Sequence, residues 1–170
     1  MVRPLSLGEA RAEEDFVWGD LPIHGAYYVT AAPPPEELVT SVRAVVLCGE
    51  RVLVCRNSDA VHALPGGRRE PGETFEETLR REVLEETGYA IERPRLLGTA
   101  YLRHLGPKPA GYGFPHPDFL WAVYVAESDG QRVEVPDDDY ELEAWFARLP
   151  DALALVDLGS RVYVEAAIAG

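Results

Sequence analysis

Lysine is almost absent from this chain of 170 residues, in which Lys108 stands alone and 29 acidic residues outnumber 16 basic ones. The resulting formal net charge of −13 repels the phosphate backbone of nucleic acids and anionic lipid surfaces. We therefore expect neither DNA nor a membrane as a partner. A small phosphorylated substrate is compatible with this charge, because a bound divalent metal ion reverses the local field.

Cysteine and long apolar runs are also scarce. Cys48 and Cys55 are the only cysteines, and they flank a predicted turn where a disulfide is conceivable. Since the start of the chain has no export-like pattern, we expect two buried thiols in a cytoplasmic protein. No segment approaches the ~20 consecutive apolar residues of a membrane-spanning helix.

Length and apolar content fit one domain with a full core, since 46% of the 170 residues are hydrophobic. Residues 1–15 are charged and are predicted to be irregular. Aromatic and β-branched residues over 16–30 predict a strand or hairpin, and three prolines in 31–35 predict a stiff connector. We therefore divide the chain into an N-terminal extension, residues 1–38, and a main domain, residues 39–170. The extension is expected to pack on the main domain or to exchange with a second copy in a homodimer.

The main domain reads as an α+β fold with a mixed sheet covered by helices. Its predicted strands are residues 39–47, 52–55, 95–103, 119–126 and 143–146. Its predicted helices are residues 74–88 and 161–169. Residues 105–118 hold four prolines and three glycines, so we expect an irregular loop there.

The helix predicted after Thr74 carries carboxylates on its apolar face. Thr74 and Glu77 form a capping-box pattern, and Gly88 is a typical residue just beyond a helix end. At ~100° per residue, Glu82 and Glu86 fall roughly 20° on either side of Phe75, which starts the apolar stripe. An amphipathic helix normally places its charges on the opposite face.

Carboxylates on a core-facing stripe require a positive partner, because burying an unpaired charge costs several kcal/mol. Arg80 and Arg81 are expected to rotate away from Glu82 and Glu86 toward solvent. Clustered oxygen ligands suit a hard divalent cation such as Mg²⁺ or Mn²⁺. The alternative is a solvated acidic helix.

The segment 67–89, GRREPGETFEETLRREVLEETGY, resembles the Nudix box, G-x5-E-x7-R-E-U-x-E-E-x-G-U, where U is a bulky apolar residue. Only its last position departs, with Tyr89 in place of an aliphatic residue. The chain is therefore similar to the Nudix hydrolase family. This resemblance implies an α/β/α sandwich and Mg²⁺- or Mn²⁺-dependent hydrolysis of a diphosphate bond.

The resemblance also implies roles for individual residues. Metal ligands and catalytic groups would be Glu82, Glu85 and Glu86. The carbonyl of Gly66 would be a further ligand, and an acidic residue beyond the box, Asp139 or Glu141, would complete the set. Structural support of the site would come from Gly67, Glu73, Arg81 and Gly88.

The substrate is not fixed by these residues. Phosphate contacts could come from Arg68 or Arg69, which follow the implied metal ligand Gly66. Base or sugar contacts could come from Lys108, Tyr112 and Phe114. A nucleotide sugar, ADP-ribose, a nucleoside triphosphate and a dinucleoside polyphosphate all stay open. The rival functions are a non-catalytic nucleotide-binding or regulatory module and an RNA-directed pyrophosphohydrolase. A prenyl diphosphate isomerase would need a differently placed cysteine and further histidines.

Overall fold

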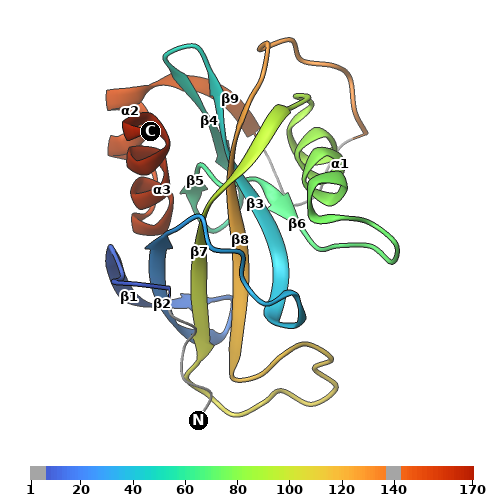
Figure 1. The fold of residues 1–170 in the computed structure, drawn as a ribbon, viewed down its shortest axis with the longest axis vertical. Coiled ribbons are helices and arrows are strands. Elements are labelled where there is room, and N and C mark those ends of the chain that lie inside the picture. The colour runs from blue at the N-terminus through green and yellow to red at the C-terminus, as the bar shows by residue number, and fades with distance from the viewer. Residues whose placement is uncertain (1–6, 137–142) are drawn as a thin grey trace.

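The strands follow the runs of β-branched and aromatic residues. A computed structural model describes residues 7–136 and 143–170, and its strands lie in one sheet (Figure 1). They are β1 (Ala12–Trp18), β2 (Leu21–Val29), β3 (Val39–Cys48), β4 (Arg51–Arg56), β5 (Val61–His62), β6 (Gly66–Gly67), β7 (Glu92–His104), β8 (Asp118–Glu127) and β9 (Glu143–Arg148).

The sheet is mixed, as the sequence predicts. Its main path runs β1-β2-β7-β8-β3-β4-β5, with β6 paired to β3 and β9 paired to β4. Strands β3 and β8 run parallel, whereas β3 is antiparallel to β4 and β6. Parallel strands are usually covered on both faces, which explains the nearly continuous apolar run in β3.

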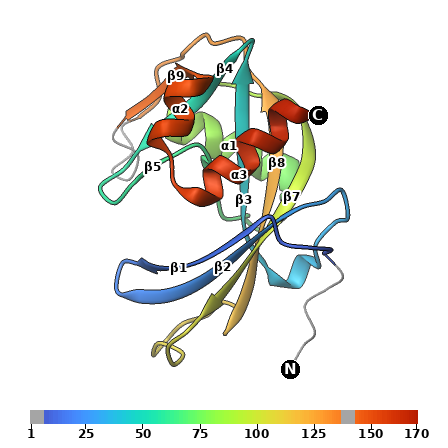
Figure 2. The ribbon, with the colours of Figure 1, turned by 90° about the vertical axis from the view of Figure 1, so that its left-hand side faces the viewer.

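Helices cover both faces of this sheet (Figures 1 and 2). Helix α1 (Phe75–Thr87) lies on one face, and helices α2 (Leu149–Leu155) and α3 (Leu158–Ala169) lie on the other. Successive residues of β3 point to opposite faces: Ala44 belongs to the buried cluster that contains Leu79 of α1, and Val45 to the one that contains Tyr163 of α3. The predicted α/β/α sandwich is confirmed.

Two expectations about the ends of the chain were wrong, and one helix was not predicted. β1 begins at Ala12, inside the segment predicted to be irregular, because its run of acidic residues resembles a solvated stretch. Helix α3 begins at Leu158, ahead of the predicted start, and Asp157 caps it by accepting from the Ser160 amide at 2.7 Å. Helix α2 was missed because it contains Pro150, which is tolerated in a first helical turn.

The N-terminal hairpin joins the sheet through β2, whose residues pair with β7 from Ile23–His104 to Val29–Gly98. In this chain it therefore forms one edge of the sheet. Its exchange with a second copy, and the boundary at residue 38, stay predictions. Cys55 is buried, as expected, whereas Cys48 is only half-buried, and no disulfide joins the two. Among the described residues, no helix combines the length and the apolar character needed to cross a membrane.

Candidate active site

Helix α1 has both termini fixed by the residues that predicted it. The Thr74 hydroxyl accepts from the Glu77 amide at 3.2 Å, and Glu77 accepts from the Thr74 amide at 2.7 Å. Gly88 ends the helix at φ 76°, a left-handed conformation that favours glycine. These local contacts set where α1 begins and ends, and therefore where each glutamate lies along the helix axis.

The two glycines of β6 bring the backbone against this helix. Gly66 pairs with Arg43 of β3, and a Cβ atom at Gly66 would lie 2.0 Å from the Val42 carbonyl oxygen. A Cβ atom at Gly67 would lie 2.4 Å from the Glu82 carboxylate. Gly66 therefore lies against the backbone of β3, and Gly67 against the Glu82 carboxylate of α1, too closely for a side chain at either position unless a neighbour moves.

Glu82 and Glu86 face this loop, one helical turn apart. The Glu86 carboxylate accepts a hydrogen bond from the Gly66 amide at 2.9 Å. Both glutamates are half-buried, whereas Glu85 is exposed. The helical pattern thus located the two carboxylates on the inner side correctly.

Arg81 holds the loop and the helix together. Its Nε and Nη2 atoms donate to the two Glu73 carboxylate oxygens at 2.7 and 2.9 Å, and Nη2 also donates to the Arg68 carbonyl at 3.1 Å. Its Nη1 atom donates to Glu82 at 2.8 Å and to Glu85 at 3.2 Å. Arg81 therefore clamps the residues before α1 to the helix itself.

The expectation that Arg81 rotates away from Glu82 was wrong. Its Cα position does lie off the apolar stripe, but a long guanidinium side chain can bend back toward carboxylates that surround it. Arg80 instead donates to the Ile91 carbonyl oxygen. A helical wheel places backbone positions and gives no information about the ends of long side chains.

The Glu73–Arg81 pair predicts a pH dependence of stability. The bonds from Arg81, followed by the one from the Glu70 amide, lower the pKa of Glu73 from 4.5 to about 2. A carboxylate whose pKa is lower in the folded state stabilises the fold at pH values above its unfolded-state pKa. This stabilisation is lost as the pH falls toward the folded-state pKa. Glu73→Gln should therefore be less stable than the parent protein at neutral pH, with the difference shrinking from pH 4.5 toward pH 2.

Urea unfolding of both proteins across this pH range measures the effect. Glu76→Gln is the matched control, since Glu76 is an exposed glutamate of the same helix. A stability difference that stays constant down to pH 2 would show that Glu73 does not titrate through this contact.

The donor set of this site fits a hard divalent cation in its chemistry. Glu82 and Glu86 present carboxylate oxygens to a backbone cradle that a single Cβ atom would fill. Within residues 7–136 and 143–170, however, no three Asp, Glu, His or Cys side chains converge on one metal position. Arg81 instead holds the carboxylates of Glu82 and Glu85. The ligand set therefore stays a prediction, and Asp139 and Glu141 lie outside the described residues.

A cavity of about 180 Å³ opens beside the loop, on the side of Glu86. Of the predicted substrate contacts, Arg68, Tyr112 and Phe114 line it. The Arg68 guanidinium lies 3.9 Å from the centre of the Phe114 ring. The loop 105–117, irregular as predicted, therefore reaches the site.

Two other predicted contacts lie elsewhere. Arg69 donates to Glu36 at 3.2 Å and covers the Phe75 ring. Lys108 is exposed and does not line the cavity. Neither position supports a role in substrate binding in this conformation of the chain.

The structure adds residues that the sequence analysis missed. Arg43, Trp18 and Trp121 line the same cavity from β3, β1 and β8. A charged residue in the middle of the apolar run of β3 was the available signal for Arg43, because a buried strand seldom carries an unpaired charge. The two tryptophans carried no such signal.

Comparison with known proteins identifies the family. The family model described as NUDIX domain matches residues 37–165, so the chain belongs to the Nudix family. Two curated relatives share the name NAD-capped RNA hydrolase NudC. The one from Escherichia coli O1:K1 / APEC is 31% identical over 96 residues, covering 56% of this chain and 32% of the relative. The one from Stutzerimonas stutzeri (strain A1501) is 29% identical over 112 residues, covering 64% and 36%. This chain spans about a third of their length.

Solved structures show the same fold. A mutant of the Bacillus subtilis pyrophosphohydrolase BsRppH has a TM-score of 0.62 at 19% identity, over 90% of this chain and 92% of its own. The NUDIX domain of Shewanella oneidensis NrtR, complexed with ADP ribose, has a TM-score of 0.59 at 18% identity, over 79% and 89%. At these identities the likeness concerns the fold alone.

Proposed function

We propose that this protein is a divalent-metal-dependent pyrophosphohydrolase that cleaves the diphosphate bond of a nucleoside diphosphate derivative. One observation carries the proposal: Glu82 and Glu86 of α1 meet the Gly66–Gly67 backbone beside an open cavity. Mg²⁺ or Mn²⁺ at these carboxylates, with Glu85 and the Gly66 carbonyl as further ligands, would neutralise the diphosphate and acidify water.

The residues of the site would have separate roles in this hydrolysis. Hydrolysis adds water to one phosphorus and breaks its bond to the bridging oxygen, giving two phosphate-ended products. Glu82 would orient the water and accept its proton, and the hydrogen bond from Arg81 supports this role because it holds the Glu82 carboxylate in position. The Arg43 and Arg68 guanidinium groups line the cavity and can bind phosphate oxygens.

The names of the curated relatives favour a second substrate of the same chemical class. NAD, like the cap of the RNA that those relatives hydrolyse by name, contains a diphosphate between two nucleosides. The net charge of −13 opposes binding of a long RNA. We therefore rank a free dinucleotide or nucleotide sugar ahead of RNA.

A substrate panel tests the proposed function. Phosphate or nucleotide release would be measured for ADP-ribose, a nucleotide sugar, NAD, a nucleoside triphosphate, a dinucleoside polyphosphate and NAD-capped RNA. Each would be incubated with Mg²⁺, with Mn²⁺ or with chelator. We expect turnover of at least one compound with metal and none with chelator. Nucleotide binding without turnover of any compound would instead indicate a non-catalytic module.

Two broader predictions go with this proposal. We propose that the protein is cytoplasmic, and that it forms a homodimer through the N-terminal hairpin. Light scattering of the purified protein measures the second, because a monomeric mass at micromolar concentration contradicts it.

A further inference from the structure

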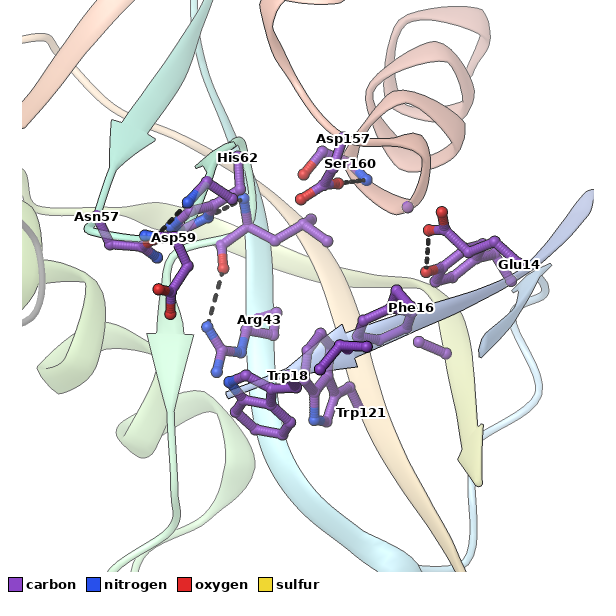
Figure 3. A pocket seen from close by; sticks show the side chains of 16 residues that line it. Glu14, Phe16, Trp18, Arg43, Asn57, Asp59, His62, Trp121, Asp157 and Ser160 are labelled. Carbon is purple, nitrogen blue, oxygen red and sulfur yellow. Dashed lines mark hydrogen bonds between the residues drawn. The ribbon is translucent and has the colours of Figure 1, made fainter. Parts of the chain in front are cut away.

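A second, larger cavity lies beside the first and is shown in Figure 3. Its volume is about 300 Å³. Arg43, Trp18 and Trp121 line both cavities, so the two spaces share a wall. The larger cavity lies on the face of the sheet that α3 covers, since Gly159 and Ser160 of that helix also line it. Nothing in the proposed catalytic chemistry uses this space.

One side of the larger cavity is aromatic. Alternation along β1 turns Phe16 and Trp18 inward, and Trp121 joins them from β8. The Trp18 and Trp121 rings meet edge to face, with their centroids 5.8 Å apart. All three side chains are only half-buried, so a ligand can reach them. Flat aromatic groups favour such surfaces.

The other sides of the cavity carry carboxylates. Figure 3 shows Asp59 and Asp157 across from the tryptophans, and Glu14 beside Phe16. Glu14 accepts from the Tyr27 hydroxyl through Oε1 at 2.7 Å, and Asp157 accepts from the Ser160 amide through Oδ1 at 2.7 Å. Each of these bonds uses one oxygen of its carboxylate. The cavity therefore presents hydrogen-bond acceptors to a ligand.

Charge determines which end of a nucleotide suits which cavity. Among the described residues that line the larger cavity, Arg43 is the only arginine or lysine, and it lies at the shared wall. A phosphate placed beyond it would meet three carboxylates and be repelled. The group inside must therefore carry no negative charge, and a flat group with hydrogen-bond donors fits both the aromatic side and the carboxylates.

Arg43 is held so that it can bind a phosphate at that boundary. Its Nε atom donates to the Ser41 hydroxyl at 2.9 Å, and Nη1 donates to the Leu64 carbonyl at 3.2 Å. Its guanidinium carbon lies 4.7 Å from the centre of the Trp121 ring. Neither hydrogen bond uses Nη2, which leaves that amino group for a ligand. Arg43 also pairs, through the backbone of β3, with Gly66 of the Gly66–Gly67 segment.

We propose that the larger cavity binds the nucleoside of the substrate. Its base carries an exocyclic amino group, as adenine and cytosine do, and packs against Phe16, Trp18 and Trp121. The amino group donates to the carboxylates of the cavity, and the 5′-phosphate lies at Arg43 and leads toward the Gly66–Gly67 loop. The path of the phosphate chain rests on the proposed function, whereas binding of the nucleoside monophosphate needs no metal.

Fluorescence titration in chelator tests the binding step alone. Trp18 and Trp121 line the cavity and Trp145 does not, so two of the three tryptophans report on binding. We expect saturable quenching by AMP, and affinities about tenfold lower for IMP and for ribose 5-phosphate, which lack the amino group or the whole base. CMP and UMP form a second pair differing in the amino group. Equal affinity for AMP and ribose 5-phosphate would overturn the inference.

A tryptophan series links the cavity to turnover of the best compound of the substrate panel. Trp121→Leu should raise KM about tenfold and lower kcat far less, since stacking contributes to binding before the reaction. Trp121→Phe should restore most of the affinity, and circular dichroism verifies the fold of both variants. The same weakening should be measured for AMP in chelator.

The proposed hydrolase activity and the proposed nucleoside site can be refuted independently. Metal-dependent hydrolysis with a KM unaffected by Trp121→Leu would refute the nucleoside site and leave the hydrolase. Binding of AMP that Trp121→Leu weakens about tenfold, with no turnover of any compound, would support the nucleoside site and refute the hydrolase.

Discussion

Replacing Glu86 by glutamine should lower kcat for metal-dependent hydrolysis by roughly 10³-fold, the scale of losing one stabilising electrostatic group from an active site. The substitution removes one negative charge from the predicted metal position. Its amide oxygen can still accept from the Gly66 amide, which Glu86 binds at 2.9 Å. The loss should therefore appear in catalysis and metal affinity rather than in folding.

Glu76→Gln makes the same change of charge at an exposed position of α1 and should retain activity. Steady-state kinetics over a range of Mg²⁺ concentrations, together with thermal unfolding, distinguishes the two variants. If Glu86→Gln hydrolyses substrate at the parental rate, Glu86 is not a metal ligand, and the proposed site is wrong.

Gly67→Ala should abolish most activity for a steric reason. The added methyl group would lie 2.4 Å from the Glu82 carboxylate, a distance that atoms do not adopt. Either the glutamate or the loop must move, and a displacement of about 1 Å in an active site can reduce the rate by roughly 10²-fold. We expect lower kcat and weaker metal binding together.

The matched control is Gly106→Ala, whose methyl group would meet nothing closer than Pro22 at 3.8 Å. It should leave both quantities at the parental level. Isothermal titration with Mn²⁺ would measure metal binding in both variants without requiring turnover. A fully active Gly67→Ala would mean that the Glu82 side chain is free to leave its position without consequence.

The parts of the site that sequence alone predicted are those fixed by local contacts. The capping box of Thr74 and Glu77, the left-handed Gly88 and the apolar stripe of α1 all act within one helix. They set the two inward carboxylates without information from the rest of the chain. The expected mixed sheet was correct for a similar reason, since apolar runs and turn residues mark strands locally.

The parts that it did not predict depend on distant segments. The direction of the Arg81 side chain is set by Glu73 and by the Arg68 carbonyl, which lie in the loop before the helix. The larger cavity draws its lining from β1, β3, β8 and α3. No periodicity within any one of these elements shows that Trp18 meets Trp121, because β2 and β7 lie between β1 and β8 in the sheet and the contact depends on how the sheet curls.

The parallel pairing of β3 with β8 also has a consequence for how the chain folds. It joins residues as distant in sequence as Val39 and Leu120, which pair directly across the two strands. Contacts between such distant residues form slowly, because the chain must lose the conformational entropy of a large loop before the contacts form. Helix α1 and the β3–β4 hairpin need only short loops. In pulse-labelling hydrogen exchange we therefore expect amides of α1 to gain protection before those of β8, so that the helix with Glu82 and Glu86 forms before the strand with Trp121.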